Sequence, residues 1–135
     1  MLKAKMIHPE IMEVLSLCGH GCKVLIADGN YPLKARTAGA RRVYLGLTPG
    51  LPTVTEVLEA LLSVSNFEAA EVMLTDDGSE PEIFADFRRL LPDMELTKVG
   101  KYDFYSHCCE PMVELAISTG EQRTYANILL TVGCS

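Results

Sequence analysis

Hydrophobic and polar positions along this chain follow two spacings, one typical of helices and one typical of buried strands. Apolar residues at helical spacing after Pro9, after Thr53 and over residues 83–91 predict three helices. Short apolar runs bounded by glycine, proline or aspartate predict strands over residues 23–27, 42–47, 71–75, 95–99, 112–118 and 127–132. Strands that alternate with helices are typical of the α/β class. We therefore expect a single layered domain over residues 1–135, with a mostly parallel central sheet flanked by helices.

Three details of this pattern bear on the arrangement of the elements. A capping box, which marks the start of a helix, occurs at residues 53–56 and again at residues 79–82. Residues 101–110 fit either a short helix or a loop over the core. The last two strands are separated by a turn around residues 119–121 and by no clear helix. We expect these two strands to pair antiparallel, which makes the sheet mixed.

Composition and charge argue against two classes of partner. Lys and Arg total 12 and Asp and Glu total 18, a net charge of −6, whereas nucleic-acid-binding modules concentrate positive charge. No run approaches the roughly 18 continuous apolar residues of a membrane span, and polar residues from His8 onward interrupt any signal-peptide core. The chain has five cysteines, and two of them are adjacent, whereas a secreted disulfide framework typically has an even number. We expect a cytoplasmic protein that binds neither nucleic acid nor membrane.

His20 is the first candidate for chemistry. It lies between two glycines, where the backbone turns freely and no neighbouring side chain covers the ring. An imidazole has an ordinary pKa of about 6.5, which suits a proton donor or acceptor near neutral pH. The alternative interpretation is a helix end followed by a loop histidine without function.

Asp28 is the second candidate, because it follows the predicted strand at residues 23–27. In α/β sheets, ligand-binding groups lie at the carboxyl ends of strands. A carboxylate at that place can accept hydrogen bonds from two sugar hydroxyls. It can equally be an Asx-turn residue that satisfies only its own loop.

Tyr125 and Asn127 form a third candidate group. They flank one small residue, so in an extended chain their side chains point to the same side. A phenol and an amide together offer donors and acceptors to a polyol. The alternative is a pair at the start of a strand that faces solvent.

Thiols and imidazoles gather at residues 18–22 and 107–109, which raises the question of a metal. Zinc needs four such ligands in a tetrahedron, and adjacent cysteines are poorly placed to share one ion. Buried free cysteines behave as small hydrophobic residues. We expect no metal, and a thiol or zinc protein stays an alternative. The sequence has no phosphate-binding loop, dinucleotide-binding turn or serine-hydrolase elbow.

These motifs occur in an order that resembles the ribose pyranase / fucose mutarotase family. The matching segments are residues 17–21, 26–32, 119–121 and 125–130, followed by Gly133, and they extend through essentially the whole chain. The turn at residues 30–32 and the Phe104–Tyr105 pair resemble the fucose branch. The family commonly has an aspartate directly after Gly-His-Gly, where this chain has Cys22, and that difference puts the rate or the substrate in question.

The resemblance implies an α/β subunit that assembles into a ring-like homo-oligomer, with sugar sites near subunit boundaries. It implies His20 as the proton donor and Asp28, Tyr125 and Asn127 as sugar contacts. The family also has a basic residue or histidine before the last strands that binds sugar. Lys101 is the best match for it in this chain, and His107 is a weaker one.

The chemistry that follows is the opening and closing of a cyclic sugar, which needs one proton delivered to the ring oxygen and one removed from the anomeric hydroxyl. His20 would handle one proton and Tyr125 or a water the other, with no cofactor. We expect an isomerase acting on an L-fucose-like monosaccharide; the alternatives are a D-ribose pyranase and a non-catalytic sugar-binding or transport-accessory protein. His20 and Asp28 flank one strand and are roughly 17–20 Å apart if it is straight. Either the glycine loop folds back, or two subunits share one site.

Overall fold

The computed structural model describes all 135 residues and contains four helices and six strands. The helices are α1 (Pro9–Leu17), α2 (Val54–Leu62), α3 (Phe84–Leu90) and α4 (Lys101–His107). The strands are β1 (Lys23–Ala27), β2 (Arg41–Tyr44), β3 (Phe67–Met73), β4 (Leu96–Val99), β5 (Val113–Ser118) and β6 (Ile128–Val132). The ambiguous segment after Gly100 is therefore helical.

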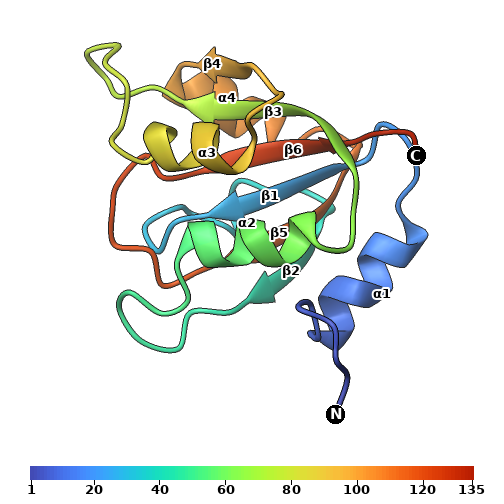
Figure 1. The fold of residues 1–135 in the computed structure, drawn as a ribbon. Coiled ribbons are helices and arrows are strands. Elements are labelled where there is room, and N and C mark those ends of the chain that lie inside the picture. Colours follow the sequence, from blue (N-terminus) through green and yellow to red (C-terminus); the bar gives the residue numbers. More distant parts are fainter.

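All six strands form one sheet in the order β2-β5-β1-β6-β3-β4 (Figure 1). The pairs β2–β5, β5–β1 and β3–β4 are parallel, whereas β6 is antiparallel to both of its neighbours, β1 and β3. The expected mixed and mostly parallel sheet is confirmed. A single strand, β6, accounts for the mixed character.

The expectation that the last two strands pair with each other is wrong. β1 lies between β5 and β6 and hydrogen-bonds to both. The connection between them crosses the carboxyl end of β1, where Thr119 N–H donates to Ala27 O and Gly29 N–H donates to Glu121 O. This arrangement places the apolar β1 strand between two hydrogen-bonded neighbours, and it keeps β5 and β6 apart.

The helices cover the two faces of the sheet unequally. The larger core, of 24 buried residues, joins one face of the sheet to α1, α2 and α3. The smaller core, of 11 buried residues, lies on the other face, where Phe104 of α4 and Tyr31 and Leu33 from the segment after β1 cover it. In Figure 1, α2 and α3 lie in front of the sheet and α4 lies behind it. None of the helices has the length and hydropathy needed to span a membrane.

Only one of the two capping boxes starts a helix. Thr53 accepts a hydrogen bond from Glu56 N–H, and the Glu56 carboxylate accepts one from Thr53 N–H, at the start of α2. The prediction that residues 79–82 form a second capping box is wrong, because α3 begins later, at Phe84, without a side-chain cap. The Ser79 hydroxyl hydrogen-bonds with the Thr75 hydroxyl at 2.6 Å, so it is part of the turn after β3.

Candidate functional site

A cavity of about 200 Å³ lies where the carboxyl ends of β1 and β3 meet the start of β6 and of α4. Four of the residues predicted from the sequence line it together: Asp28, Lys101, Tyr125 and Asn127. They come from three separate parts of the chain, which the sheet order brings side by side. The remaining lining residues are Asn30, Tyr31, Met73, Tyr105 and Thr124.

Asp28 holds two walls of this cavity together. One carboxylate oxygen accepts hydrogen bonds from Asn30 N–H at 2.8 Å and Tyr31 N–H at 2.9 Å, and the other accepts one from Ala126 N–H at 3.0 Å. The residue is 2% exposed, and its burial raises the pKa of the carboxyl, against the opposing effect of these hydrogen bonds. The Asx-turn geometry is therefore present, and it extends to the segment before β6. Direct sugar binding by Asp28 stays a prediction.

Asn127 lines the cavity beside Asp28. Its side-chain oxygen accepts a hydrogen bond from Asp28 N–H at 2.8 Å, which fixes the orientation of the amide. The Asn127 side chain also lowers the pKa of the Asp28 carboxyl. The amide carries both donors and an acceptor, the groups that a sugar hydroxyl needs.

Tyr125 lines the cavity for a different reason from the one the sequence predicted. Its φ of 56° is left-handed, so residues 125–127 are not an extended strand, and β6 begins only at Ile128. A non-glycine residue in this region costs about 1–3 kcal/mol and is often found at functional sites. Strand alternation is thus the wrong explanation for the shared direction of Tyr125 and Asn127, because a strained turn produces it.

Lys101 and His107 lie at opposite ends of α4, and only Lys101 reaches the cavity. The Lys101 ammonium lies 3.3 Å from a carboxylate oxygen of Asp76, and this contact raises its pKa. His107 instead hydrogen-bonds to the Glu71 carboxylate, with Nδ1 2.6 Å from Oε1. The basic residue of the cavity is therefore Lys101, and the cation is paired with a carboxylate outside the lining.

His20 lies outside the cavity, at the other end of β1. Its Nε2 is 2.8 Å from the Glu68 carboxylate, and the two side chains are 58% and 47% exposed. Gly21 N–H donates to Val132 O at the end of β6, whereas Asp28 and Asn127 meet at the start of β6. The glycine loop does not fold back. The separation of His20 from the cavity thus follows the length of the strand, roughly 17 Å at 3.3 Å per residue.

None of the cysteines lines the cavity, and all five are free thiols. Cys18 and Cys22 line a separate hollow beside α1, together with Arg41 and Glu114. No three histidine, cysteine, aspartate or glutamate side chains converge in a way that could hold a metal ion. The metal alternative gains no support from these positions.

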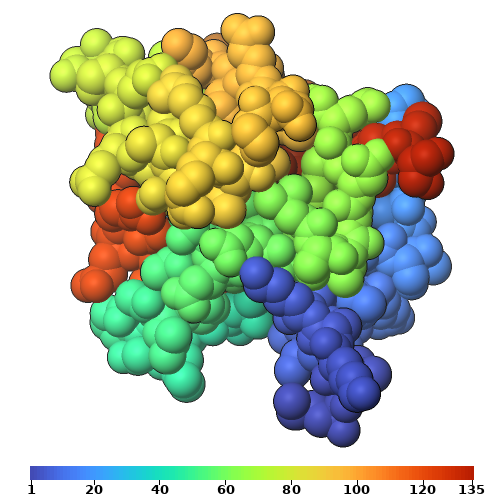
Figure 2. Space-filling model, in the orientation of Figure 1, coloured from blue at the N-terminus to red at the C-terminus, as the bar shows by residue number.

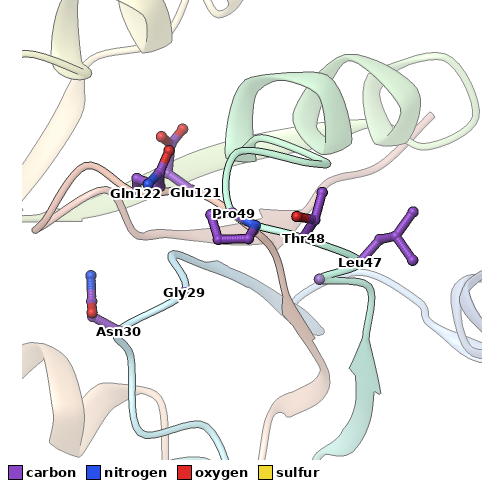
Figure 3. Close-up of a pocket in the computed structure, with 9 residues that line it drawn as sticks. Gly29, Asn30, Leu47, Thr48, Pro49, Glu121 and Gln122 are labelled. Carbon is purple, nitrogen blue, oxygen red and sulfur yellow. The ribbon is translucent and has the colours of Figure 1, made fainter.

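Another hollow, of about 470 Å³, lies at the same edge of the sheet as the cavity, over the ends of β1, β2 and β5. Figure 3 shows Asn30, Pro49, Glu121 and Gln122 around it, with Leu47 directed away from the others. Asn30 lines both this hollow and the cavity that contains Asp28. None of the residues predicted to contact sugar lines the hollow of about 470 Å³.

Sequence reasoning missed several residues of the cavity wall. Asn30 and Tyr31 follow closely after Asp28, within the segment 26–32 that carries the family resemblance. Tyr105 is four residues after Lys101 and so lies on the same face of α4. A helical assignment of this segment would have identified it. Met73 carried no signal, because its spacing is that of an ordinary core residue.

Comparison with known proteins shows which family the chain belongs to. The model of the RbsD / FucU transport protein family matches residues 1–135. The chain belongs to this family. Curated relatives named D-ribose pyranase include those of Clostridium novyi, 31% identical, and Variovorax paradoxus, 32% identical, each over 98% of both chains.

Solved structures of RbsD / FucU proteins share the fold. Bacillus subtilis RbsD complexed with D-ribose gives a TM-score of 0.87 at 24% identity, covering 100% of this chain and 99% of that one. The fucose mutarotase of Streptococcus pneumoniae in complex with L-fucose gives 0.84 at 23% identity over the same shares. The resemblance to this family is therefore confirmed. The names of the relatives, D-ribose pyranase and fucose mutarotase, denote isomerases of sugars. The curated names favour ribose, so the closer likeness to the fucose branch stays a prediction.

Proposed function

We propose that this protein is a monosaccharide mutarotase, an isomerase that opens and closes the ring of a free sugar. The observation that carries the proposal is the single cavity shared by Asp28, Lys101, Tyr125 and Asn127. It offers a carboxylate, an ammonium, a phenol and an amide to the hydroxyls of one small polyol. The cavity volume of about 200 Å³ suits a monosaccharide better than a longer saccharide.

An L-fucose-like sugar is the substrate we propose first. The cavity has a polar side and an apolar side, the latter formed by Met73 and the rings of Tyr31 and Tyr105. Tyr31 and Tyr105 pack edge to face with centroids 5.4 Å apart, which gives this wall a fixed shape. A 6-deoxy sugar presents a methyl group that such a wall would bury.

D-ribose is the second candidate, and the activity would then be interconversion of pyranose and furanose forms. Curated relatives that are 31% and 32% identical to this chain are named D-ribose pyranase. The pyranose form of D-ribose has no exocyclic carbon and would leave part of the apolar wall uncovered. Relative rates on the two sugars separate these candidates.

The mechanism requires two proton transfers at the ring and its anomeric carbon. The anomeric O–H loses its proton and forms the carbonyl, while the bond from the anomeric carbon to the ring oxygen breaks and that oxygen gains a proton. We assign the first proton to Tyr125, which lines the cavity, and the second to His20. Reversal on the other face of the carbonyl gives the second anomer.

His20 must then come from a second copy of the chain. Within one chain it lies at the far end of β1, held by Glu68 at the surface, while the cavity lies at the near end. A ring-like homo-oligomer, with the glycine loop of one subunit placed over the cavity of its neighbour, would complete the site. The exposed position of His20 leaves it accessible to such a neighbour.

The first experiment measures exchange between anomeric proton signals of L-fucose, D-ribose and D-galactose by NMR, with and without the protein. Faster exchange on one sugar supports the proposal and identifies the substrate. Saturable binding without faster exchange would favour the sugar-binding or transport-accessory alternative, and Cys22 would then be the first position to restore to aspartate. If the folded protein neither binds a sugar nor speeds exchange, the mutarotase proposal and the sugar-binding alternative are both refuted.

A second experiment tests whether two subunits share one site. Chains carrying His20→Ala and chains carrying Asn127→Ala are each expected to be inactive as pure oligomers. When the two are co-expressed and purified by two different tags, sites that combine a native His20 with a native Asn127 should recover activity. Mixed oligomers that stay as inactive as the parents would show that each site lies within one chain.

A further inference from the structure

The two thiols on either side of His20 line one hollow of the surface. Cys18 ends α1 and Cys22 precedes β1, and both line the hollow of about 410 Å³ beside α1. Each cysteine is partly buried and packs against the larger core. Only seven residues line this hollow, so the fold gathers two thiols at a single opening. The proposed sugar chemistry uses neither of them.

A tight turn brings the two cysteines to this hollow. Cys18 N–H donates to Val14 O and Leu15 O, both at 3.1 Å, which closes the end of α1. Cys22 N–H then donates to Gly19 O at 3.2 Å, so the chain reverses between the cysteines. A turn of this kind holds its first and fourth Cα atoms within about 7 Å, and Cys18 directly precedes it. A disulfide needs Cα atoms about 4.4–6.8 Å apart, which is the same scale.

The loop between the cysteines is anchored at one end and open at the other. Gly21 has a left-handed φ of 90°, and its N–H donates to Val132 O, while Val132 N–H donates to Cys22 O. In Figure 2 the C-terminal residues, in red, lie beside the blue segment that follows α1. A Cβ at Gly19, in contrast, would meet no atom within 4 Å. A bond between the thiols would therefore move the Gly19 side of the loop, and His20 with it.

The two thiols differ in how they would react. Burial, and then the neighbouring Cys22, raise the pKa of the Cys18 thiol to about 12. Cys18 is therefore protonated at physiological pH. The thiolate is the form that attacks a disulfide, so Cys22 is the thiol that reacts first. Once the Cys22 sulfur is bonded to another sulfur, it carries no charge that opposes ionisation of Cys18.

We propose that Cys18 and Cys22 are a redox-modification site, a reversible disulfide whose closure displaces His20 and slows sugar exchange. The effect on exchange rests on the proposed function, in which His20 is the proton donor, whereas the disulfide itself does not. The bond would close a ring of residues 18–22 around His20 and draw it away from Glu68, which lies 2.8 Å from His20 Nε2 in the reduced chain. A short ring strains its disulfide, and strained disulfides are easily reduced, which suits a reversible modification.

The oxidation balances with a small disulfide, oxidised glutathione, as the oxidant. Cys22 loses its proton to solvent, and its thiolate attacks one glutathione sulfur and releases the other glutathione as a thiolate. That thiolate takes the proton of Cys18. The Cys18 sulfur then attacks Cys22 Sγ and releases the second glutathione, which takes a proton from solvent. Two electrons pass from the cysteine pair to the oxidant, and two molecules of reduced glutathione leave.

The first test detects the bond without sugar. The folded protein is equilibrated with oxidised glutathione, its remaining thiols are blocked with iodoacetamide in urea, and the chain is cut with trypsin. Both cysteines lie in one tryptic peptide, residues 6–23. After oxidation this peptide should escape blocking and be two hydrogens lighter than the reduced peptide, and dithiothreitol should reverse the change. A peptide with two blocked thiols, or with glutathione adducts alone, would overturn the proposal.

The second test measures the effect on sugar exchange. The oxidised wild type should exchange sugar about 10²-fold more slowly than the reduced protein, because a displacement of about 1 Å at a reacting group can cost this much. Cys18→Ser and Cys22→Ser should be insensitive to the oxidant, whatever their own rates. Cys134→Ser removes an exposed thiol outside the hollow and should keep the rate and the sensitivity of the wild type. Equal rates for the oxidised and reduced wild type, or an oxidant-sensitive Cys22→Ser, would overturn the proposal.

A measurement on His20 keeps this inference distinguishable from the proposed function. The ¹H–¹³C signal of the His20 ring, identified by His20→Ala, should shift on oxidation of the wild type and stay unchanged in Cys22→Ser. An unshifted signal in protein whose disulfide has formed would overturn the proposal. A wild type that exchanges no sugar in either state refutes the proposed function, while the peptide mass and the His20 signal still decide this inference.

Discussion

The two ends of β1 hold the two main candidates for acid–base chemistry in contrasting surroundings. At the carboxyl end, Asp28 is 2% exposed and accepts three main-chain hydrogen bonds. At the amino end, His20 is 58% exposed and has one side-chain partner, Glu68. The first end is fixed by the fold of a single chain. The second is exposed and held by a single side chain, so the two ends should respond differently to substitution.

The largest effect is expected at the exposed end, and on activity alone. His20→Ala should slow sugar exchange by about 10²–10⁴-fold, roughly 3–5 kcal/mol of barrier, because it removes one proton donor. Its free energy of unfolding should change by no more than about 0.5 kcal/mol. NMR exchange and urea denaturation measure the two quantities. Normal exchange in this variant would remove His20 from the mechanism.

At the buried end, stability should fall as well. Asp28→Ala leaves three main-chain N–H groups without their acceptor, and we expect a loss of about 3 kcal/mol in the free energy of unfolding. Asp28→Asn keeps one acceptor oxygen and should lose less. Urea denaturation of the two variants beside the wild type checks both values. A loss below about 1 kcal/mol for the alanine variant would contradict the organising role of the carboxylate.

A third substitution at the buried end gives a pH-dependent effect. Burial favours the protonated form of Glu121, but its hydrogen bonds and ion pair with Arg123 outweigh this and hold its pKa below the ordinary 4.5. A lowered carboxyl pKa stabilises the fold above pH 4.5, and the stabilisation is lost as the pH falls through the folded-state value. Glu121→Gln should therefore cost about 1–2 kcal/mol at pH 7. The difference from the wild type should shrink in urea titrations below pH 4.5; a constant difference would contradict this explanation.

The smallest effect is expected for the ion pair at the exposed end. Glu68→Gln removes the partner of His20, but both side chains are about half exposed. Such pairs contribute roughly 0–1 kcal/mol, so stability should stay within about 0.5 kcal/mol of the wild type. Thermal or urea denaturation checks this value. A loss above 1 kcal/mol would mean that the two ends of β1 are built more alike than their exposure indicates.

Much of the cavity was predictable because ligand groups follow strand ends in α/β sheets. Asp28 follows β1, and the residues before β6 lie at the same edge of the sheet. The same rule would have identified Asp76, which comes soon after β3. Its ion-pair partner, Lys101, lies 25 positions further along the sequence, so no local pattern pointed to this contact.

The errors came from long-range arrangement and from backbone conformation. Nearness in sequence favours a hairpin between the last two strands, but strand order depends on what each strand buries, and β1 separates them. The left-handed φ of Tyr125 carries no sequence signal, since tyrosine rarely adopts it. The second capping box failed because Ser79 hydrogen-bonds within its own turn.

The place of β6 in the sheet has a consequence for how the chain folds. β6 is the last strand in sequence, yet it lies at the centre of the sheet, between β1 and β3. Its partners precede it by about a hundred and about sixty residues, so these pairings have high contact order and form slowly. During synthesis, β1 and β3 have no central partner until β6 emerges from the ribosome. A nascent chain therefore exposes apolar strand edges for most of its synthesis, and those edges are sites for aggregation or chaperone binding.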